Sequence, residues 1–128
     1  MQINDLENIA KKYRREIFEK LLETKQGHPG SIFSMMEIVV SLYHGGFVRL
    51  DKKKKKFIDK VLISKGHATS ALYPILRDFG IISSKEWNKW GKKKSQLRVF
   101  GNISIPGVDI TSGSLGHCIG AGAGMAVS

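Results

Sequence analysis

The sequence predicts an α/β fold, a parallel sheet flanked by helices, of which these 128 residues encode only a part. A short β-prone run at 60–64 is followed by a glycine turn and a helical pattern at 68–79, which is the order of a strand–turn–helix unit. Apolar residues also recur at helical spacing between positions 5 and 26. Because a parallel sheet needs several strands and only one is clear, the predicted α/β fold is incomplete in this chain.

The first helix is predicted from Asp5 to Gln26, with Asn4 or Asp5 as its N-cap. Its core-facing stripe comprises Leu6, Ile9, Ala10, Tyr13, Ile17, Leu21 and Leu22. The segment Gly27-His28-Pro29-Gly30 ends this helix, since proline disfavours the helical conformation at the residue before it.

The middle of the chain is predicted to contain further helices, one loop and one strand. A helix from about residue 34 to His44 is apolar on most of its faces, so we expect it to be buried. Lys52–Lys56 predicts a solvated loop, and Lys60–Ser64 predicts a buried strand of the parallel sheet. Helices follow at Ala68–Phe79 and at Ser84–Trp90, the second with a serine cap at 83 or 84.

Small residues dominate the end of the sequence, where Ser114–Ser128 has the pattern of a helix. Each glycine inside a helix costs about 1 kcal/mol relative to alanine, so we expect tight packing of this helix against other protein. No cap or glycine stop precedes Ser128. We therefore expect residues 1–128 to be a partial domain that further protein completes.

The net charge of +10 comes from two segments of the chain. Residues 49–65 hold eight basic and two acidic side chains, residues 85–98 hold six and one, and residues 99–128 contain no Lys or Arg. Trp87 and Trp90 lie in the second segment. They are either a stacking platform for nucleic acid or the apolar face of one helix. We favour the apolar face, so nucleic acid is not the expected partner.

Composition excludes two classes of protein. A single cysteine, Cys118, forms no internal disulfide or zinc cluster, so a disulfide-built secreted scaffold is excluded and a reducing compartment is expected. No apolar run of about 18 residues predicts a membrane span, and the N-terminus lacks the apolar core of a signal peptide. The expected localisation is cytoplasmic. We interpret Cys118 as a small buried side chain and not as a nucleophile.

Three of the four histidines, His28, His67 and His117, lie at glycine-bordered turns or helix starts. Backbone amides are exposed at such turns, and a phosphorylated ligand can approach them closely. His44 instead ends an apolar helix and is interpreted as structural. The histidines and the single cysteine do not follow metal-ligand spacings, and His117 and Cys118 are adjacent, so we predict no metal site from this chain alone.

Three motifs, in order along nearly the whole chain, resemble the N-terminal, diphosphate-binding part of transketolase. They are Lys25-Gln-Gly-His28-Pro-Gly-Ser31, Ile63-Ser-Lys-Gly-His67-Ala with Leu72-Tyr73, and Pro106-Gly-Val-Asp-Ile-Thr-Ser-Gly113-Ser-Leu-Gly, which leads into the small-residue helix. The Ser-Lys-Gly-His-Ala form resembles transketolase more than the related deoxyxylulose-phosphate synthases. The nearer resemblance is to short transketolases whose N-terminal part is a separate subunit.

This resemblance implies a thiamine-diphosphate-binding fold, thiamine diphosphate and Mg²⁺ as cofactors, and transfer of a two-carbon ketol unit between sugar phosphates. In the family's pattern His28 hydrogen-bonds the substrate near the reacting carbon and His67 contacts the cofactor diphosphate, so these are the implied catalytic residues. The resemblance also implies that Gly113, Ser114 and Leu115 line the cofactor, Gly113 through its backbone and Leu115 by packing on the pyrimidine.

Two stretches depart from the family's pattern. Phe100-Gly101-Asn102-Ile103 stands where many relatives have a substrate histidine in Gly-His-Pro, so Asn102 is the candidate to hydrogen-bond a sugar hydroxyl. His117 stands where relatives commonly have Gln. The family's Gly-Asp-Gly metal motif, its later Asn ligand and the glutamate that activates the aminopyrimidine are absent from this sequence. We therefore expect this chain alone to have no measurable transketolase activity.

The leading hypothesis is the N-terminal part of a transketolase that works with a C-terminal subunit or domain, as a homo- or hetero-oligomer. One alternative is a catalytically silent binding or assembly module on the same fold. The other, less favoured, is a basic nucleic-acid-binding domain, which predicts affinity that falls steeply with salt. The enzyme hypothesis predicts instead that the reading frame continues into a Gly-Asp-Gly segment.

Overall fold

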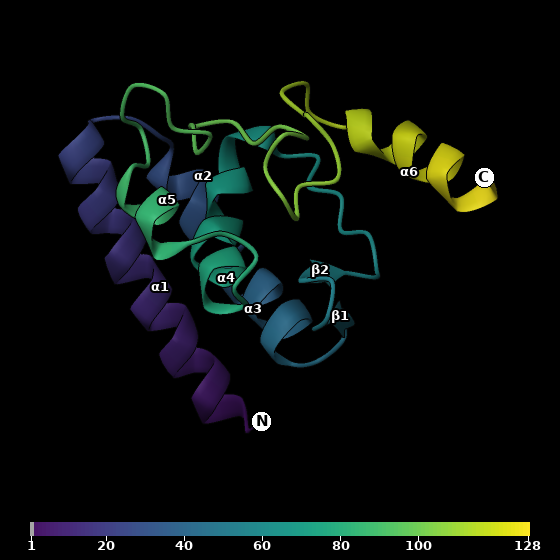
Figure 1. Cartoon of the computed structure of the whole chain (residues 1–128), viewed down its shortest axis with the longest axis horizontal. Coiled ribbons are helices and arrows are strands. Elements are labelled where there is room, and N and C mark those ends of the chain that lie inside the picture. Colours follow the sequence, from purple (N-terminus) through teal and green to yellow (C-terminus); the bar gives the residue numbers. More distant parts are fainter. Residues whose placement is uncertain (1) are drawn as a thin grey trace.

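The computed structural model describes residues 2–128, which form a helical body and one projecting helix (Figure 1). The helices are α1 (Ile3–Thr24), α2 (Pro29–Phe33), α3 (Met36–His44), the 3₁₀ helix η1 (Gly66–Leu72), α4 (Tyr73–Asp78), α5 (Ser84–Asn88) and α6 (His117–Val127). The strands are β1 (Leu50–Asp51) and β2 (Lys56–Phe57). In Figure 1, α1 lies along one side of the body, and α6 projects from the opposite side.

Helix α1 confirms the predicted first helix, but it begins earlier than expected. The backbone N–H of Gln2 donates to the Asp5 carboxylate at 3.0 Å, so Gln2 is the cap and Asp5 belongs to the first turn. The predicted cap at Asn4 or Asp5 is therefore wrong. At the other end, Lys25 takes a left-handed conformation with φ of 53° and stops the helix two residues before Gly27.

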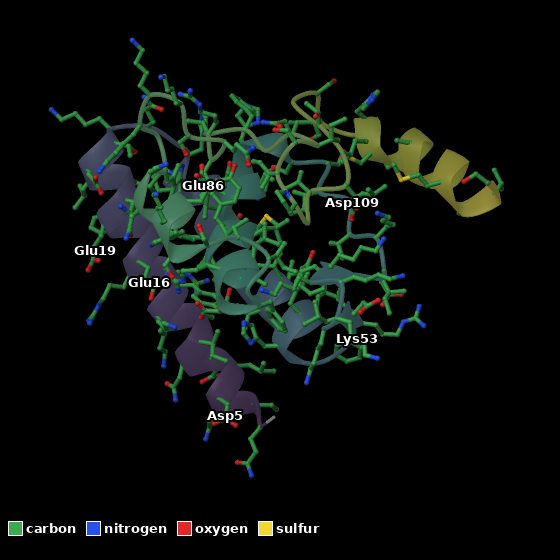
Figure 2. All side chains as sticks on the ribbon, in the orientation of Figure 1. Asp5, Glu16, Glu19, Lys53, Glu86 and Asp109 are labelled. Atoms are coloured by element: carbon green, nitrogen blue, oxygen red, sulfur yellow. The ribbon has the colours of Figure 1, made fainter. Side chains whose placement is uncertain are left out.

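The core lies between α1, α3, η1 and α4. Its largest fully buried side chains are Trp90, Tyr13, Tyr73, Ile17, Ile32, Met36, Leu72, Ile75, Leu76, Leu97, Ile105 and Val39. Helix α3 confirms the predicted buried helix, although one face remains open at Ile38. Figure 2 shows Glu16 on the face of α1 toward the body and Glu19 on the face away from it.

The predicted helix at 68–79 is present as two shorter pieces, η1 and α4. Pro74 lies in the first turn of α4 and has no N–H to donate to the carbonyl four residues earlier. A continuous α-helix through this point would lose that hydrogen bond. The 3₁₀ piece instead has its own interactions, such as the bond from Thr69 Oγ1 to the Gly66 carbonyl at 2.9 Å.

The predicted parallel sheet is not formed within residues 2–128. Lys60–Ser64 has no regular secondary structure, because no other described segment pairs with its backbone. The carbonyl of Ile63 accepts instead from Ser112 Oγ at 3.0 Å. The sheet that is described pairs β1 with β2 antiparallel, Leu50 opposite Phe57. The exposed lysine turn of this hairpin carries Lys53, labelled in Figure 2.

Helix α5 confirms the short predicted helix, with the Ser83 hydroxyl accepting from the Glu86 N–H at 3.1 Å. Trp87 is 7% exposed and Trp90 is 2% exposed, and their rings pack together. Neither indole is available to stack on a base, so the apolar-face interpretation is confirmed. The nucleic-acid alternative thereby loses its aromatic platform.

Helix α6 confirms the predicted small-residue helix and is largely exposed. Ile119 and Val127 are 78% and 89% exposed, respectively, whereas Cys118 is buried and Gly122, in the middle of the helix, lies against the Leu62 side chain. Across residues 2–128, no helix combines the length and apolar character that a membrane crossing needs.

Candidate functional site

His28 and His67 lie side by side although they are far apart in sequence. Their ring centroids are 4.7 Å apart, and the rings meet edge to face at 86°. Each histidine begins a helix: His28 precedes Pro29 at the start of α2, and His67 lies in the first turn of η1. Because α2 packs against η1, the two helix starts meet and carry their imidazoles together.

Neither imidazole of this pair has a hydrogen-bond partner among residues 2–128. His28 is exposed and His67 is half-buried. The Phe100 ring packs beside both, with centroids 6.1 Å from His28 and 4.9 Å from His67. The pair therefore presents ring nitrogens that can still donate or accept hydrogen bonds to a ligand.

The third glycine-rich motif lies against the turn that carries His67. Gly66 packs so closely on Ser112 that a Cβ at position 66 would overlap the Ser112 carbonyl oxygen. Two residues before Gly66, the Ser64 hydroxyl accepts from the Cys118 N–H in the first turn of α6 at 3.2 Å. The segments containing residues 28, 67 and 113–116 therefore converge around the start of η1.

Residues 113–115 form the open part of this convergence. No atom lies within 4 Å of a Cβ built on Gly113, and Leu115 is 71% exposed. Gly116, with a left-handed φ of 86°, turns the chain into α6 and leaves His117 exposed in its first turn. An open glycine backbone and an exposed apolar side chain therefore lie near a partly exposed imidazole, an arrangement that can accept a ligand with both anionic and apolar parts.

Asn102 lies in the loop that carries Phe100, but it is not joined to the histidines. Its side-chain oxygen accepts from the Ser104 N–H at 2.9 Å and from the Ser104 hydroxyl. Within residues 2–128 it makes no hydrogen bond to either imidazole. The side-chain amide N–H groups of Asn102 remain as donors, so its predicted contact with a sugar hydroxyl stays a prediction.

Three contributors to this region were missed by sequence reasoning. Phe100 stands within a departure from the family pattern, and its aromatic character was the available signal. Lys65 Nζ donates to Ser34 Oγ at 2.8 Å, and Ser34 Oγ donates to the Ser31 carbonyl at 3.1 Å. This pair of bonds ties the His67 turn to α2. No local pattern indicates it, since its members belong to segments distant in sequence.

His44 belongs to a different cluster, at the end of α3. The Tyr13 hydroxyl donates to Asp78 Oδ2 at 2.9 Å and lies 2.7 Å from His44 Nε2. Burial lowers the pKa of His44. Burial and the adjacent Asp78 raise the pKa of Tyr13. Burial opposes ionisation of Asp78, but hydrogen bonds from Arg77, Lys12 and Tyr13 outweigh it and hold the pKa of that carboxyl below its usual value. These contacts agree with the structural interpretation of His44.

No group of three or more His, Cys, Asp or Glu side chains suited to a metal ion occurs in residues 2–128. The side chains that the structure describes therefore do not form a Mg²⁺ site by themselves. Cys118 is buried, at 5% exposed, and its N–H bonds to Ser64. This agrees with its interpretation as a small buried side chain.

Residues 7–128 match the protein family described as the transketolase, thiamine diphosphate binding domain. Together with the three converging motifs, this match defines the class: a thiamine diphosphate-binding domain. The chain belongs to the transketolase family.

Relatives in several organisms carry transketolase names. The chain is 34% identical to one subunit of the apulose-4-phosphate transketolase of Phocaeicola vulgatus, over all of this chain and 46% of that protein. It is 31% identical to a transketolase of Buchnera aphidicola and 28% identical to human transketolase, over 94% and 98% of this chain and 18% and 20% of those proteins. The chain thus spans less than half the length of these relatives.

Proposed function

We propose that this chain is the N-terminal part of a transketolase that transfers a two-carbon ketol unit between sugar phosphates. The observation that supports this most is the convergence of three separated segments, through the His28–His67 ring contact and the packing of Gly66 on Ser112. A binding surface assembled from helix starts and glycine turns suits a phosphorylated cofactor.

In this proposal the chain's own residues bind and orient the cofactor and the sugar. His67 donates a hydrogen bond to a diphosphate oxygen, and Gly113 lets the cofactor lie against bare backbone. Leu115 supplies an apolar surface for an aromatic ring. His28 holds or moves a proton on the substrate hydroxyl or carbonyl next to the reacting carbon. When bound, thiamine diphosphate supplies the stabilised carbanion that ketol transfer needs.

The proposed enzyme needs more protein than this chain. A divalent cation at this site would need ligands from additional protein, since residues 2–128 contain no group of three or more side chains suited to a metal ion. Leu62, Ile119 and Val127 are apolar side chains in the segments we expect this additional protein to cover. The Phocaeicola vulgatus relative is named as one subunit of its enzyme, which supports a completing polypeptide and a hetero-oligomer here.

The two positively charged segments favour anionic substrates in general. The exposed lysines at 52–56 and 92–94 give the surface a positive field that raises the local concentration of sugar phosphates. Such a field attracts anions in general and is not a specific contact with one sugar phosphate.

The test compares this chain alone with the complex that it forms. The chain is expressed with an N-terminal tag in its own host, and both the isolated chain and the purified complex receive thiamine diphosphate and Mg²⁺. Xylulose 5-phosphate and ribose 5-phosphate are the donor and acceptor, and a seven-carbon ketose phosphate is the measured product. We expect product from the complex and none from the isolated chain.

Two results would contradict the proposal. A complex that binds thiamine diphosphate but moves no two-carbon unit from xylulose 5-phosphate or fructose 6-phosphate would favour the catalytically silent assembly module. Product formation by the isolated 128-residue chain would show that no completing protein is needed.

A further inference from the structure

Phe100 lies outside the three motifs, and its ring packs beside both histidines of the site. Its ring contacts His67 edge to face, with centroids 4.9 Å apart and planes at 69°, and lies 6.1 Å from His28. The Phe100 residue is 40% exposed, so part of its ring lies open beside the imidazoles. It forms an apolar wall next to two polar rings.

The loop on either side of Phe100 is fixed to the body. Two residues earlier, the Arg98 carbonyl accepts from the buried Tyr73 hydroxyl at 2.7 Å. One residue later, Gly101 packs so closely on Thr69 that an added Cβ would overlap the Thr69 methyl group. These two contacts fix the backbone on both sides of Phe100 and so keep the residue beside the histidine pair.

We propose that Phe100 is a specificity-determining residue of the site, selecting acceptor aldoses by the group on the carbon next to the aldehyde. This inference rests on the proposed function, in which His28 lies at the reacting carbon. A ring so near that imidazole can reach the next carbon of the acceptor.

The aromatic character of Phe100 determines which acceptor aldoses the site favours. An aromatic ring accepts C–H groups by packing but offers no hydrogen-bond donor and only a weak acceptor face. A hydroxyl pressed against it loses water without gaining a partner. A site with a hydrogen-bonding group at this position would instead reject an acceptor that lacks the hydroxyl. The Phe100 wall therefore makes the site tolerant of acceptors without a hydroxyl on that carbon.

The experiment uses the complete enzyme, with xylulose 5-phosphate as the fixed donor. Ribose 5-phosphate and 2-deoxyribose 5-phosphate are the two acceptors, and the ratio of their kcat/KM values is measured. The variants are Phe100→His, Phe100→Leu and, as a matched control, Phe47→His. Phe47 is 75% exposed and makes no ring contact with either histidine among residues 2–128.

We expect the unmodified enzyme to favour ribose 5-phosphate by less than about tenfold, and Phe100→His to increase this ratio by about tenfold or more. Phe100→Leu keeps an apolar wall and Phe47→His is remote, so both should leave the ratio unchanged. An unchanged ratio of kcat/KM values in Phe100→His, or an equal change in Phe47→His, would overturn this inference and leave the proposed function standing. An unmodified enzyme that binds thiamine diphosphate but uses neither acceptor would overturn the proposed function, and this inference with it.

Discussion

Two histidine regions of this molecule differ in what surrounds the imidazole. His44 lies among Tyr13, Asp78 and the Phe79 ring, and its Nε2 is 2.7 Å from a tyrosine hydroxyl. His28 and His67 lie against each other and have no hydrogen-bond partner among residues 2–128. The first region joins α1, α3 and α4, and the second is open to a ligand.

Hydrogen-bond partners therefore distinguish the structural histidine of this chain from the two histidines that we propose bind a ligand. A partly buried polar group normally finds a protein partner, and His44 does so through the side chains of neighbouring helices. An imidazole that keeps its hydrogen-bonding capacity at a helix start, beside two glycine turns, contributes little to stability. We expect substitutions in the His44 region to lower stability and to leave ligand binding unchanged. Substitutions of His28 or His67 should weaken ligand binding and leave stability nearly unchanged.

The largest expected effect on stability is at Gly66, where the ligand-facing region meets the body. In Gly66→Ala the added methyl group overlaps the Ser112 carbonyl, so the backbone must move or the residue 112–118 segment must separate from η1. We expect the free energy of unfolding to fall by about 3 kcal/mol, measured by urea denaturation. Gly113→Ala is the matched control, because no atom lies within 4 Å of its built Cβ. A loss as large in the control would show that the packing at Gly66 is not special.

The next-largest expected effect on stability is at Tyr13. Tyr13→Phe removes the hydroxyl that contacts both His44 and Asp78, and we expect unfolding free energy to fall by about 1–2 kcal/mol. Tyr43→Phe is the control: Tyr43 is also buried, and its hydroxyl makes no hydrogen bond among residues 2–128. Equal stability changes in the two variants would contradict a structural role for the Tyr13 network.

The smallest effect is the pH dependence of stability. Burial lowers the folded pKa of His44, with Lys12 acting in the same direction and Asp78 opposing it. The unfolded chain therefore binds a proton at residue 44 more readily, so unfolding free energy falls as pH drops through about 6.5. The Asp78 pKa is also lowered, but its contribution is lost only nearer pH 4 and below.

Urea denaturation between pH 5 and 8 measures this slope. His44→Gln should flatten it, whereas His117→Gln, at an exposed position, should not. An unchanged slope in His44→Gln would mean that residue 44 does not carry the pH dependence.

Local patterns predicted α1, α3 and α5 well, but they missed the short helix α2 and predicted a sheet that is not formed among residues 2–128. Apolar spacing placed α1 and α3, and the serine cap placed α5, because each depends on residues close in sequence. Lys60–Ser64 has a strand pattern, yet a strand exists only where another segment pairs with it, and none of residues 2–128 does so. Pro74 divides the predicted helix at 68–79 into η1 and α4.

The candidate site was predictable as motifs but not as contacts. The glycine turns singled out His28, His67 and Gly113 from the sequence, and the structure brings their segments together. The contacts of Phe100 with both imidazoles depend on the path of a long irregular loop, which no periodicity describes. The Lys65–Ser34 bond likewise joins segments distant in sequence.

The most direct test of the contrast between the two regions compares His67→Ala with His44→Ala in the complete enzyme. We expect His67→Ala to raise the thiamine diphosphate concentration for half-maximal ketol transfer by about 10- to 100-fold, as loss of a hydrogen bond to a charged group predicts, with unfolding free energy within about 0.5 kcal/mol of the unmodified chain. His44→Ala should lower unfolding free energy by about 1–2 kcal/mol and leave that concentration unchanged. If the thiamine diphosphate concentration for half-maximal transfer is unchanged in His67→Ala, or shifts equally in His44→Ala, then His67 is not the cofactor-binding histidine of the pair.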